Sequence, residues 1–151
     1  MGDRSVTRNC GPDLVRVGAG LPVAAYRDEI TTALHGGRAV IVAPPGTGKT
    51  TFVPPLVASR CSGRVIVTQP RRVAARAAAR RLATLTGTRP GEFASHTVHG
   101  ESTTTRDTKV EFVTTGVLLR RLLSDPDLTG VDAVVLDEVH ERHLDADLVV
   151  A

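Results

Sequence analysis

Short apolar runs alternate along this chain with longer segments in which apolar residues recur every three or four positions. Four of the runs are flanked by Gly, Pro or polar residues and are predicted to be buried strands. They are RAVIVA (38–43), RVIVTQ (64–69), KVEFVTT (109–115) and VDAVVLDE (131–138). A weaker strand candidate is EFASHTVHG (92–100), after which a polar loop, ESTTTRDT, is expected.

Helices are predicted before the first strand and between the strands that follow. They cover residues 21–37, which end in two glycines, then 49–60, 70–87 and 116–124. Pro54 and Pro55 should bend or shorten the second of these helices. Because near-continuous apolar strands alternate with helices, we predict an α/β fold with a parallel sheet and helices on both faces. The crossovers should be right-handed.

The chain has 151 residues, enough for one domain, and 41% of them are hydrophobic. Residues 1–20 are rich in Gly, Asp, Arg and Asn without a sustained period, so we expect a flexible leader there and the domain in residues 21–151. A formal net charge of +3 permits a nucleic-acid partner without requiring one.

Cys10 and Cys61 lie far apart and form no CxxC pair, which is typical of incidental thiols in a reducing compartment. The first residues have no apolar signal segment, and no apolar run reaches the ~18 residues that span a bilayer. The sequence therefore predicts a cytoplasmic location and no membrane partner.

A glycine-rich turn, APPGTGKTT, separates the first predicted strand from its helix. It follows the phosphate-loop pattern GxxxxGK[ST], although Ala43 stands where the first glycine is expected. Gly46 and Gly48 would let backbone N–H groups turn toward phosphate oxygens, which the N-terminus of the following helix also favours. Lys49 can reach the β- and γ-phosphates, and Thr50 can place its hydroxyl on Mg²⁺. The turn therefore predicts a site for a magnesium–nucleoside triphosphate.

Two adjacent acids, Asp137 and Glu138, end the last predicted strand, which we expect beside the strand that enters the phosphate loop. Ligands of open α/β sheets gather at the carboxyl ends of the strands. Asp137 could therefore hold Mg²⁺ together with Thr50, and Glu138 could orient or deprotonate the attacking water. His140 could be a polar residue at a helix start, or a zinc ligand with His143, for which the spacing is poor.

Four segments in order along the chain resemble the first motor domain of DEAH-type RNA helicases. They are GTGKT, TQPRRVAARAAARRLA, TTGVLLRRLLSDPDL and DEVHER. Their residues are most similar to those of the bacterial HrpB/HrpA-type members. The resemblance covers residues 21–151. It implies a RecA-like P-loop NTPase domain that hydrolyses ATP, or another nucleoside triphosphate, with Mg²⁺ to separate or remodel RNA strands.

The resemblance also implies roles for individual residues. The phosphate-binding motif is matched by Gly46, Thr47, Gly48, Lys49, Thr50 and Thr51. The DEAH box is matched by Asp137, Glu138, Val139 and His140, with Val in place of Ala. In that family the histidine links the nucleotide state to later motifs and does not bind metal. Motifs that contact the RNA backbone are matched by Arg71, Arg72, Thr114, Thr115 and Gly116. Arg81 falls where the family places an arginine against the adenine.

The arginines of the third predicted helix are only weak support for RNA binding. Arg72, Arg76 and Arg80 recur every four residues and form a stripe, which is as typical of a solvated helix face. Arg71, at the start of that helix, is better placed to meet a phosphate. Such contacts go to the backbone, so we expect RNA binding that is independent of base sequence and sensitive to salt.

The resemblance implies a second RecA-like domain and, soon after DEVHER, a Ser-Ala-Thr strand, and the 151 residues contain neither. We therefore expect the first RecA-like domain to be incomplete at its C-terminus, with a helix interrupted in LDADLVVA. The leading hypothesis is the N-terminal motor part of an ATP-dependent RNA helicase. A truncated module that holds nucleotide or RNA without turnover remains open. So does a P-loop ATPase acting on proteins or DNA, which would not need the TQPRR and TTG segments.

Overall fold

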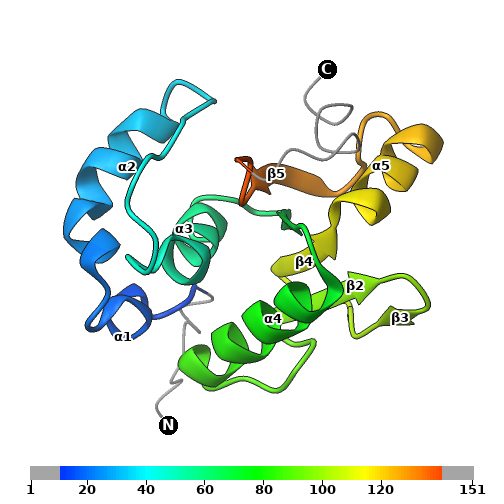
Figure 1. The fold of residues 1–151 in the computed structure, drawn as a ribbon, viewed down its shortest axis with the longest axis horizontal. Coiled ribbons are helices and arrows are strands. Elements are labelled where there is room, and N and C mark those ends of the chain that lie inside the picture. The colour runs from blue at the N-terminus through cyan, green and yellow to red at the C-terminus, as the bar shows by residue number, and fades with distance from the viewer. Residues whose placement is uncertain (1–10, 141–151) are drawn as a thin grey trace, which may run out of the picture.

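The structure, a computed structural model, describes residues 11–140 and contains one five-stranded sheet. The strand order is β3-β2-β4-β1-β5 (Figure 1). The strands are β1 (Arg64–Gln69), β2 (Ala94–Val98), β3 (Glu101–Ser102), β4 (Val110–Thr114) and β5 (Val131–Leu136). β2, β4, β1 and β5 run parallel, and the short β3 is antiparallel to β2. The α/β class and the largely parallel sheet predicted from the sequence are therefore confirmed.

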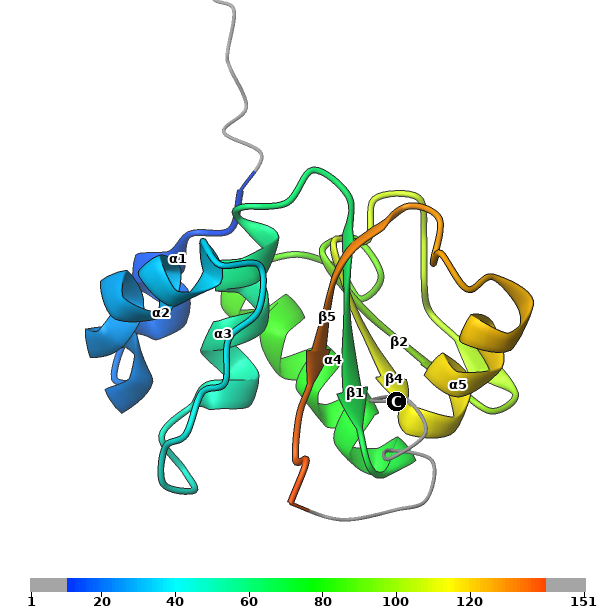
Figure 2. The same cartoon turned by 90° about the horizontal axis from the view of Figure 1, so that it is seen from above.

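Helices cover both faces of this sheet, as Figure 2 shows, with α3 and α4 on one side and α5 on the other. The helices are α1 (Leu14–Gly18), the 3₁₀ helix η1 (Pro22–Tyr26), α2 (Arg27–Leu34), α3 (Lys49–Ala58), α4 (Arg72–Thr86) and α5 (Thr115–Ser124). None of the helices between residues 11 and 140 is long and apolar enough to cross a lipid bilayer.

The alternation of side chains along the central strands builds a core on each face. Val65 and Val67 of β1 and Phe112 of β4 pack in the cluster that includes α3 and α4. Ile66 of β1 instead packs on the α5 side, against Leu118 of that helix. Because successive strand residues point to opposite faces, apolar runs such as VIV in β1 serve both cores at once.

Helix α4 lies close to the sheet because small side chains line its inner face. Ala75, Ala79 and Ala83 are buried, with Leu82 beside them. The helix ends at Gly87, which has the left-handed conformation (φ +68°) that glycine adopts without strain. Predicted helix boundaries at 70–87 thus agree with the structure to within two residues.

Residues 38–43 are not a strand, which corrects the prediction made from RAVIVA. They have no regular secondary structure, and the side chains of Val40 and Val42 are 92% and 91% exposed. An apolar, β-branched run becomes a strand only where a neighbouring strand pairs with it, and no strand within residues 11–140 does so. The expected position of β5 beside this run is wrong for the same reason, since β5 pairs with β1.

Part of the expected flexible leader is ordered, which is a second correction. Leu14–Gly18 forms helix α1, whose start is capped by the Asp13 carboxylate accepting from the N–H groups of Val15 and Arg16. Val17 is buried in the larger core cluster. The segment is too short for a helical period to be recognised in the sequence. Residues 1–10 and the LDADLVVA segment lie outside the described residues.

Candidate nucleotide site and nucleic-acid interface

One edge of the sheet collects the carboxyl ends of three neighbouring parallel strands. In the pairing register, Gln69 at the end of β1 lies opposite Thr114 at the end of β4. Thr68 lies opposite Leu136 of β5, so that Asp137 follows directly beyond the last paired residue. The helices α4 and α5 begin at this same edge, with Arg71 and Thr114 as their N-cap residues.

The phosphate loop opens α3 with two glycines in the left-handed region. Gly46 has φ +76° and Gly48, the N-cap residue of α3, has φ +89°. A Cβ on Gly48 would lie 2.9 Å from Cδ2 of Leu21, whereas one on Gly46 would meet no atom within 4 Å. The backbone O of Thr47 accepts from the N–H of Val23 at 3.0 Å, which ties the loop to η1. The loop is therefore tied to η1 through Thr47, whereas the space beside Gly46 is open.

The donors of this loop fit a phosphate group. Within residues 11–140, the backbone N–H groups of residues 46–50 make no hydrogen bond to another protein atom. These N–H groups lie together at the N-terminus of a ten-residue helix, where the first N–H groups have no partner within the helix. An anion with several oxygens would satisfy them, and the positive end of the helix dipole adds to the attraction.

Lys49 is the first residue of α3 and its ammonium lies over the loop. It donates to the carbonyl oxygen of Ala43 and, at 3.0 Å, to that of Pro44. These carbonyls are dipoles and carry no net charge. A triphosphate would therefore compete for the ammonium with charge-assisted hydrogen bonds, which are the stronger kind.

Thr50 and Asp137 meet at this edge, although they are 87 positions apart in the chain. The hydroxyl of Thr50 donates to Oδ2 of Asp137. The same oxygen accepts from Nε2 of Gln69 at 2.7 Å. The predicted pair of metal-binding residues is thus in contact, and the lysine-bearing loop and the acids lie at one edge of the sheet.

A hydroxyl and a carboxylate fit Mg²⁺, which is usually held by one or two protein oxygens plus phosphates and water. Between residues 11 and 140, no three His, Cys, Asp or Glu side chains lie close enough together to hold a metal ion by themselves. The oxygens of Thr50 and Asp137 therefore suit a metal that arrives with the nucleotide phosphates. His143, the other residue of the zinc alternative, lies outside the described residues.

Glu138 has an unusual backbone conformation beside this pair. Its φ is +56°, a region that costs a residue with a Cβ about 1 kcal/mol or more. Its N–H donates to Oδ1 of Asp137 at 3.0 Å, and its Oε2 lies 3.0 Å from Nε2 of His140. The Glu138 side chain is 40% exposed, so its carboxylate can meet water.

The predicted RNA-contacting residues fall into two groups at the same edge. Arg71 and Arg72 are exposed at the start of α4, and Thr114, Thr115 and Gly116 are half-buried at the start of α5. The pairing of Gln69 with Thr114 makes the two groups neighbours across β1 and β4. Two helix N-termini with hydroxyl and guanidinium donors beside them suit a chain of phosphates.

The remaining predicted residues have mixed surroundings. The hydroxyl of Thr47 donates to the Pro44 carbonyl oxygen at 2.9 Å, and the N–H of Thr51 donates to Gly48 O at 3.2 Å, so both stabilise the loop itself. Arg81 is exposed on α4. Its place against an adenine stays a prediction.

Arg76, one of the stripe along α4, is held by a partner that the sequence did not indicate. Its Nε donates to Oε2 of Glu101 at 3.0 Å, and Oε1 of Glu101 lies 2.7 Å from Nε2 of the buried His96. Hydrogen bonds from Arg76 and His96 lower the pKa of the Glu101 carboxyl below its usual value. These contacts tie the β2–β3 hairpin to α4, so Arg76 is a structural residue in this chain.

A buried glutamate holds α5 against the sheet and was missed by the sequence analysis. Glu111 of β4 is fully buried, and its carboxylate accepts from Arg121 of α5 at 2.6 and 2.9 Å and from Arg64 at 3.2 Å. The hydroxyls of Thr97 and Thr104 donate to it at 2.6 and 3.0 Å. A single acid inside the apolar strand VEFV was the available signal, because burial of a charge requires such partners.

Burial alone would raise the pKa of Glu111, but the hydrogen bonds from Arg121 and Thr97 and the charge of Arg121 lower it to about 2. Relative to the ordinary value of 4.5, this corresponds to about 3 kcal/mol of folding free energy. The stabilisation is complete above pH 4.5 and is lost as the pH falls toward 2. The position of helix α5 against the sheet therefore depends on the Glu111 carboxylate. The position of Thr114–Gly116, at the start of this helix, depends on it too.

Glu111→Gln should accordingly destabilise the chain by about 3 kcal/mol at pH 7, measured by denaturant unfolding. The difference from the unsubstituted chain should shrink as the pH falls from 4.5 toward 2. Glu101→Gln is the matched control, because its carboxylate also binds an arginine but is exposed, and the loss should be much smaller. Equal losses for the two variants would contradict the role given to the Glu111 network.

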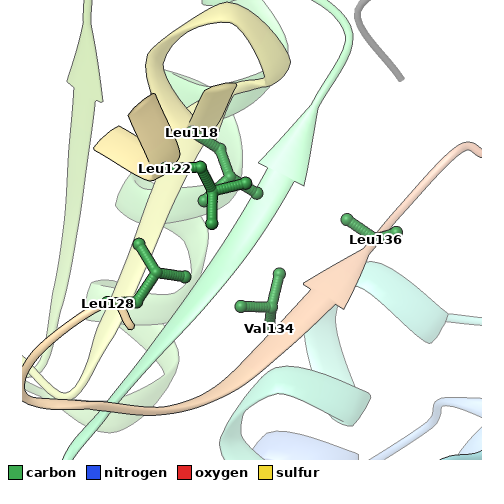
Figure 3. Close-up of a pocket in the computed structure, with 5 residues that line it drawn as sticks. All are labelled: Leu118, Leu122, Leu128, Val134 and Leu136. Carbon is green, nitrogen blue, oxygen red and sulfur yellow. The ribbon is translucent and has the colours of Figure 1, made fainter. Parts of the chain in front are cut away.

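An apolar pocket beside β5 is distinct from the edge that holds the phosphate loop. Side chains of α5, of the turn after it and of β5 line a pocket of about 210 Å³. Figure 3 shows how these side chains lie around it. Its lining residues are Leu118, Leu122, Leu128, Val134 and Leu136. It has no charged or hydrogen-bonding side chain, so it offers nothing to bind a phosphate or a metal.

Comparison with known proteins decides the family. The DEAD/DEAH box helicase family matches residues 26–146. The chain belongs to the DEAD/DEAH box helicase family. The family match includes the phosphate loop and both acids, so the contact between Thr50 and Asp137 lies inside the matched region.

Individual relatives support the DEAD/DEAH box assignment. The ATP-dependent RNA helicase HrpB of Escherichia coli is 42% identical over 134 residues, which are 87% of this chain and 17% of the relative. A probable ATP-dependent RNA helicase of Saccharomyces cerevisiae, DHR2, is 36% identical over 91% of this chain and 20% of the relative. The chain thus spans a fifth or less of the length of these relatives.

The fold agrees with a solved member of the family. The crystal structure of the Escherichia coli DEAH/RHA helicase HrpB superimposes with a TM-score of 0.82 and 41% sequence identity. The superposition covers 87% of this DEAD/DEAH box chain and 17% of the solved chain. The resemblance noted from the four sequence segments is therefore confirmed by both sequence and structure.

Proposed function

We propose that this chain is the nucleotide-binding and RNA-contacting motor part of an ATP-dependent RNA helicase. The contact that supports this most directly is the hydrogen bond between Thr50 of the phosphate loop and Asp137 after β5. It joins the two segments that must share a magnesium–triphosphate. The cytoplasm remains the predicted location.

The proposed roles follow from the positions of the side chains. The N–H groups of residues 46–50 and the ammonium of Lys49 would bind the phosphates of ATP or another nucleoside triphosphate. Thr50 and Asp137 would hold Mg²⁺, whose charge would offset the charge that develops on the phosphate oxygens. Glu138 would orient the attacking water and accept its proton. His140, in contact with the Glu138 carboxylate, would report the state of that carboxylate to other segments.

The RNA side of the proposal uses the neighbouring helix starts. Arg71 and Arg72 at α4 and Thr114–Gly116 at α5 would bind consecutive backbone phosphates of one RNA strand. Contacts to phosphates carry no information on the base, so binding should be independent of sequence. Each phosphate neutralised adds to the salt dependence of binding.

Hydrolysis also requires a positive group that stabilises the transferring phosphoryl, commonly an arginine supplied from elsewhere. Arg71 and Arg72 lie on the RNA side, and within residues 11–140 no arginine hydrogen bonds to the phosphate loop. We therefore propose a second RecA-like domain as the partner that completes the site. The relatives, of which this chain covers 17% to 20%, are long enough to contain one.

The function can be tested by measuring nucleotide hydrolysis with and without single-stranded RNA, using the longest reading frame that contains this chain. RNA of unrelated sequences should stimulate turnover to a similar extent, and the stimulation should decline as salt is raised. Binding of nucleotide and RNA without any turnover would favour the alternative of a binding module. Stimulation by a protein or by duplex DNA, and not by RNA, would contradict the proposal.

A further inference from the structure

Gln69 is a buried polar residue that the proposed catalytic roles do not use. It is the last residue of β1, it is 4% exposed, and its Nε2 donates to Oδ2 of Asp137 at 2.7 Å. Losing this acceptor would leave the buried amide unpaired, which costs about 1–3 kcal/mol. The hydrogen bond therefore holds the Gln69 side chain in place. Its partner is the carboxylate that also binds the hydroxyl of Thr50.

The backbone of Gln69 connects the same residue to the candidate RNA interface. Gln69 pairs with Thr114, the N-cap residue of α5, across β1 and β4. In the other direction, Pro70 alone separates it from Arg71, the N-cap residue of α4. Every residue proposed to contact RNA therefore lies on a segment that adjoins Gln69.

The carboxylate of Asp137 is held by three donors from three segments. Oδ2 accepts from Thr50 and Gln69, and Oδ1 accepts from the N–H of Glu138. Thr50 belongs to the nucleotide side, and the Glu138 N–H is fixed by the local turn. Only Gln69 reaches the carboxylate from a segment that also carries RNA-contacting residues.

We propose that Gln69 is a positioning residue that couples RNA binding at the starts of α4 and α5 to the orientation of the Asp137 carboxylate. RNA bound to Arg71, Arg72 and Thr114 would fix the end of β1, and the Gln69 amide would then hold Oδ2 in the orientation that receives Mg²⁺. The inference rests on the proposed function and adds the atom-level link between its two sites. Gln69 touches neither nucleotide nor RNA in this proposal.

Binding measurements test this link without relying on turnover. Two affinities are measured on the longest reading frame that contains this chain: that of a fluorescent ATP analogue, with Mg²⁺ or with EDTA, and that of single-stranded RNA, with and without magnesium–nucleotide. The coupling is the RNA affinity with magnesium–nucleotide divided by the RNA affinity without it, and for linked sites this ratio is about 5- to 150-fold. RNA must change the affinity for magnesium–nucleotide by the same factor.

Gln69→Met keeps the side chain's length and removes its hydrogen-bonding amide. We expect the coupling ratio to fall to about 2-fold or less, and the gain in nucleotide affinity from Mg²⁺ to fall about 10-fold. RNA affinity without nucleotide, and nucleotide affinity in EDTA, should change by less than about 3-fold. Thr108→Val is the matched control, because it also removes a buried polar group, whose hydroxyl donates to Gly91 O, but lies far from the carboxyl edge.

The outcomes separate this inference from the proposed function. If the unsubstituted protein binds no magnesium–nucleotide, both are overturned. If it binds nucleotide and RNA with coupling, and Gln69→Met keeps that coupling, only the role of Gln69 is overturned. Loss of coupling in Thr108→Val to the same extent would also overturn it, because the effect would then follow from general destabilisation.

Discussion

Replacing Lys49 by alanine should lower nucleotide affinity by at least about 100-fold, to a level that ordinary titrations do not detect. The ammonium lies over the loop on the carbonyl oxygens of Ala43 and Pro44 and is the one side-chain cation there within the described residues. A hydrogen bond from a charged donor contributes about 1.5–3 kcal/mol, and Lys49 would make more than one to the β- and γ-phosphates.

Lys109→Ala is the matched control, since Lys109 is the only other lysine of the chain. Its ammonium donates to Ser62 O at 2.8 Å, just before the start of β1 and thus at the opposite edge of the sheet. Both substitutions remove one positive charge, so a general electrostatic effect would appear equally in the two variants. Nucleotide affinity that is unchanged in Lys49→Ala would refute the phosphate-loop assignment. Fluorescent-nucleotide titration at fixed Mg²⁺ measures the nucleotide affinity of each variant.

Glu138→Gln should reduce hydrolysis by about 100-fold or more while nucleotide affinity stays within a few-fold. The substitution keeps the size of the side chain and removes the group that would accept the water's proton. It also leaves the Glu138 N–H, which donates to Oδ1 of Asp137, in place. Binding and turnover should therefore separate, which a loss of structure would not produce.

The control for this acid is Glu29→Gln, an exposed glutamate of α2. Turnover of both variants is measured with saturating RNA and Mg²⁺, using the longest reading frame that contains this chain. Retention of hydrolysis within about 3-fold in Glu138→Gln would assign the proton to another group. A parallel loss of nucleotide affinity would instead indicate that Glu138 contributes to metal binding, as Asp137 is proposed to do.

The contrast between residues 38–43 and residues 64–69 explains how far a local pattern can predict a fold. Both are short, apolar and β-branched, and both were predicted to be buried strands. RVIVTQ forms β1 because β4 and β5 pair with it on either side. RAVIVA has no such neighbour within residues 11–140 and leaves Val40 and Val42 exposed. The pattern reports a capacity to pair, and the partner decides whether a strand forms.

Glu111 and Gln69 illustrate a second limit, which concerns polar residues inside apolar strands. Glu111 is the one acid in KVEFVTT and Gln69 is the last residue of RVIVTQ, and neither was assigned a role from the sequence. Their importance comes from side chains that arrive from other elements: Arg121 of α5 for Glu111, and Asp137 beyond β5 for Gln69. The number and charge of such partners cannot be read from neighbouring residues.

By itself, the sequence determined the features that depend on residues close together in the chain. These are the glycine-rich phosphate loop with Lys49 and Thr50, the alternation of strands and helices, and the adjacent acids Asp137 and Glu138. Tertiary structure alone decided that Thr50 and Asp137, 87 positions apart, share a hydrogen bond and that Gln69 joins them. It also decided that RAVIVA pairs with no strand in the part of the chain from residue 11 to residue 140. The physical reason is that conformational preference acts over a few residues, whereas distances between distant segments follow from the strand order and register.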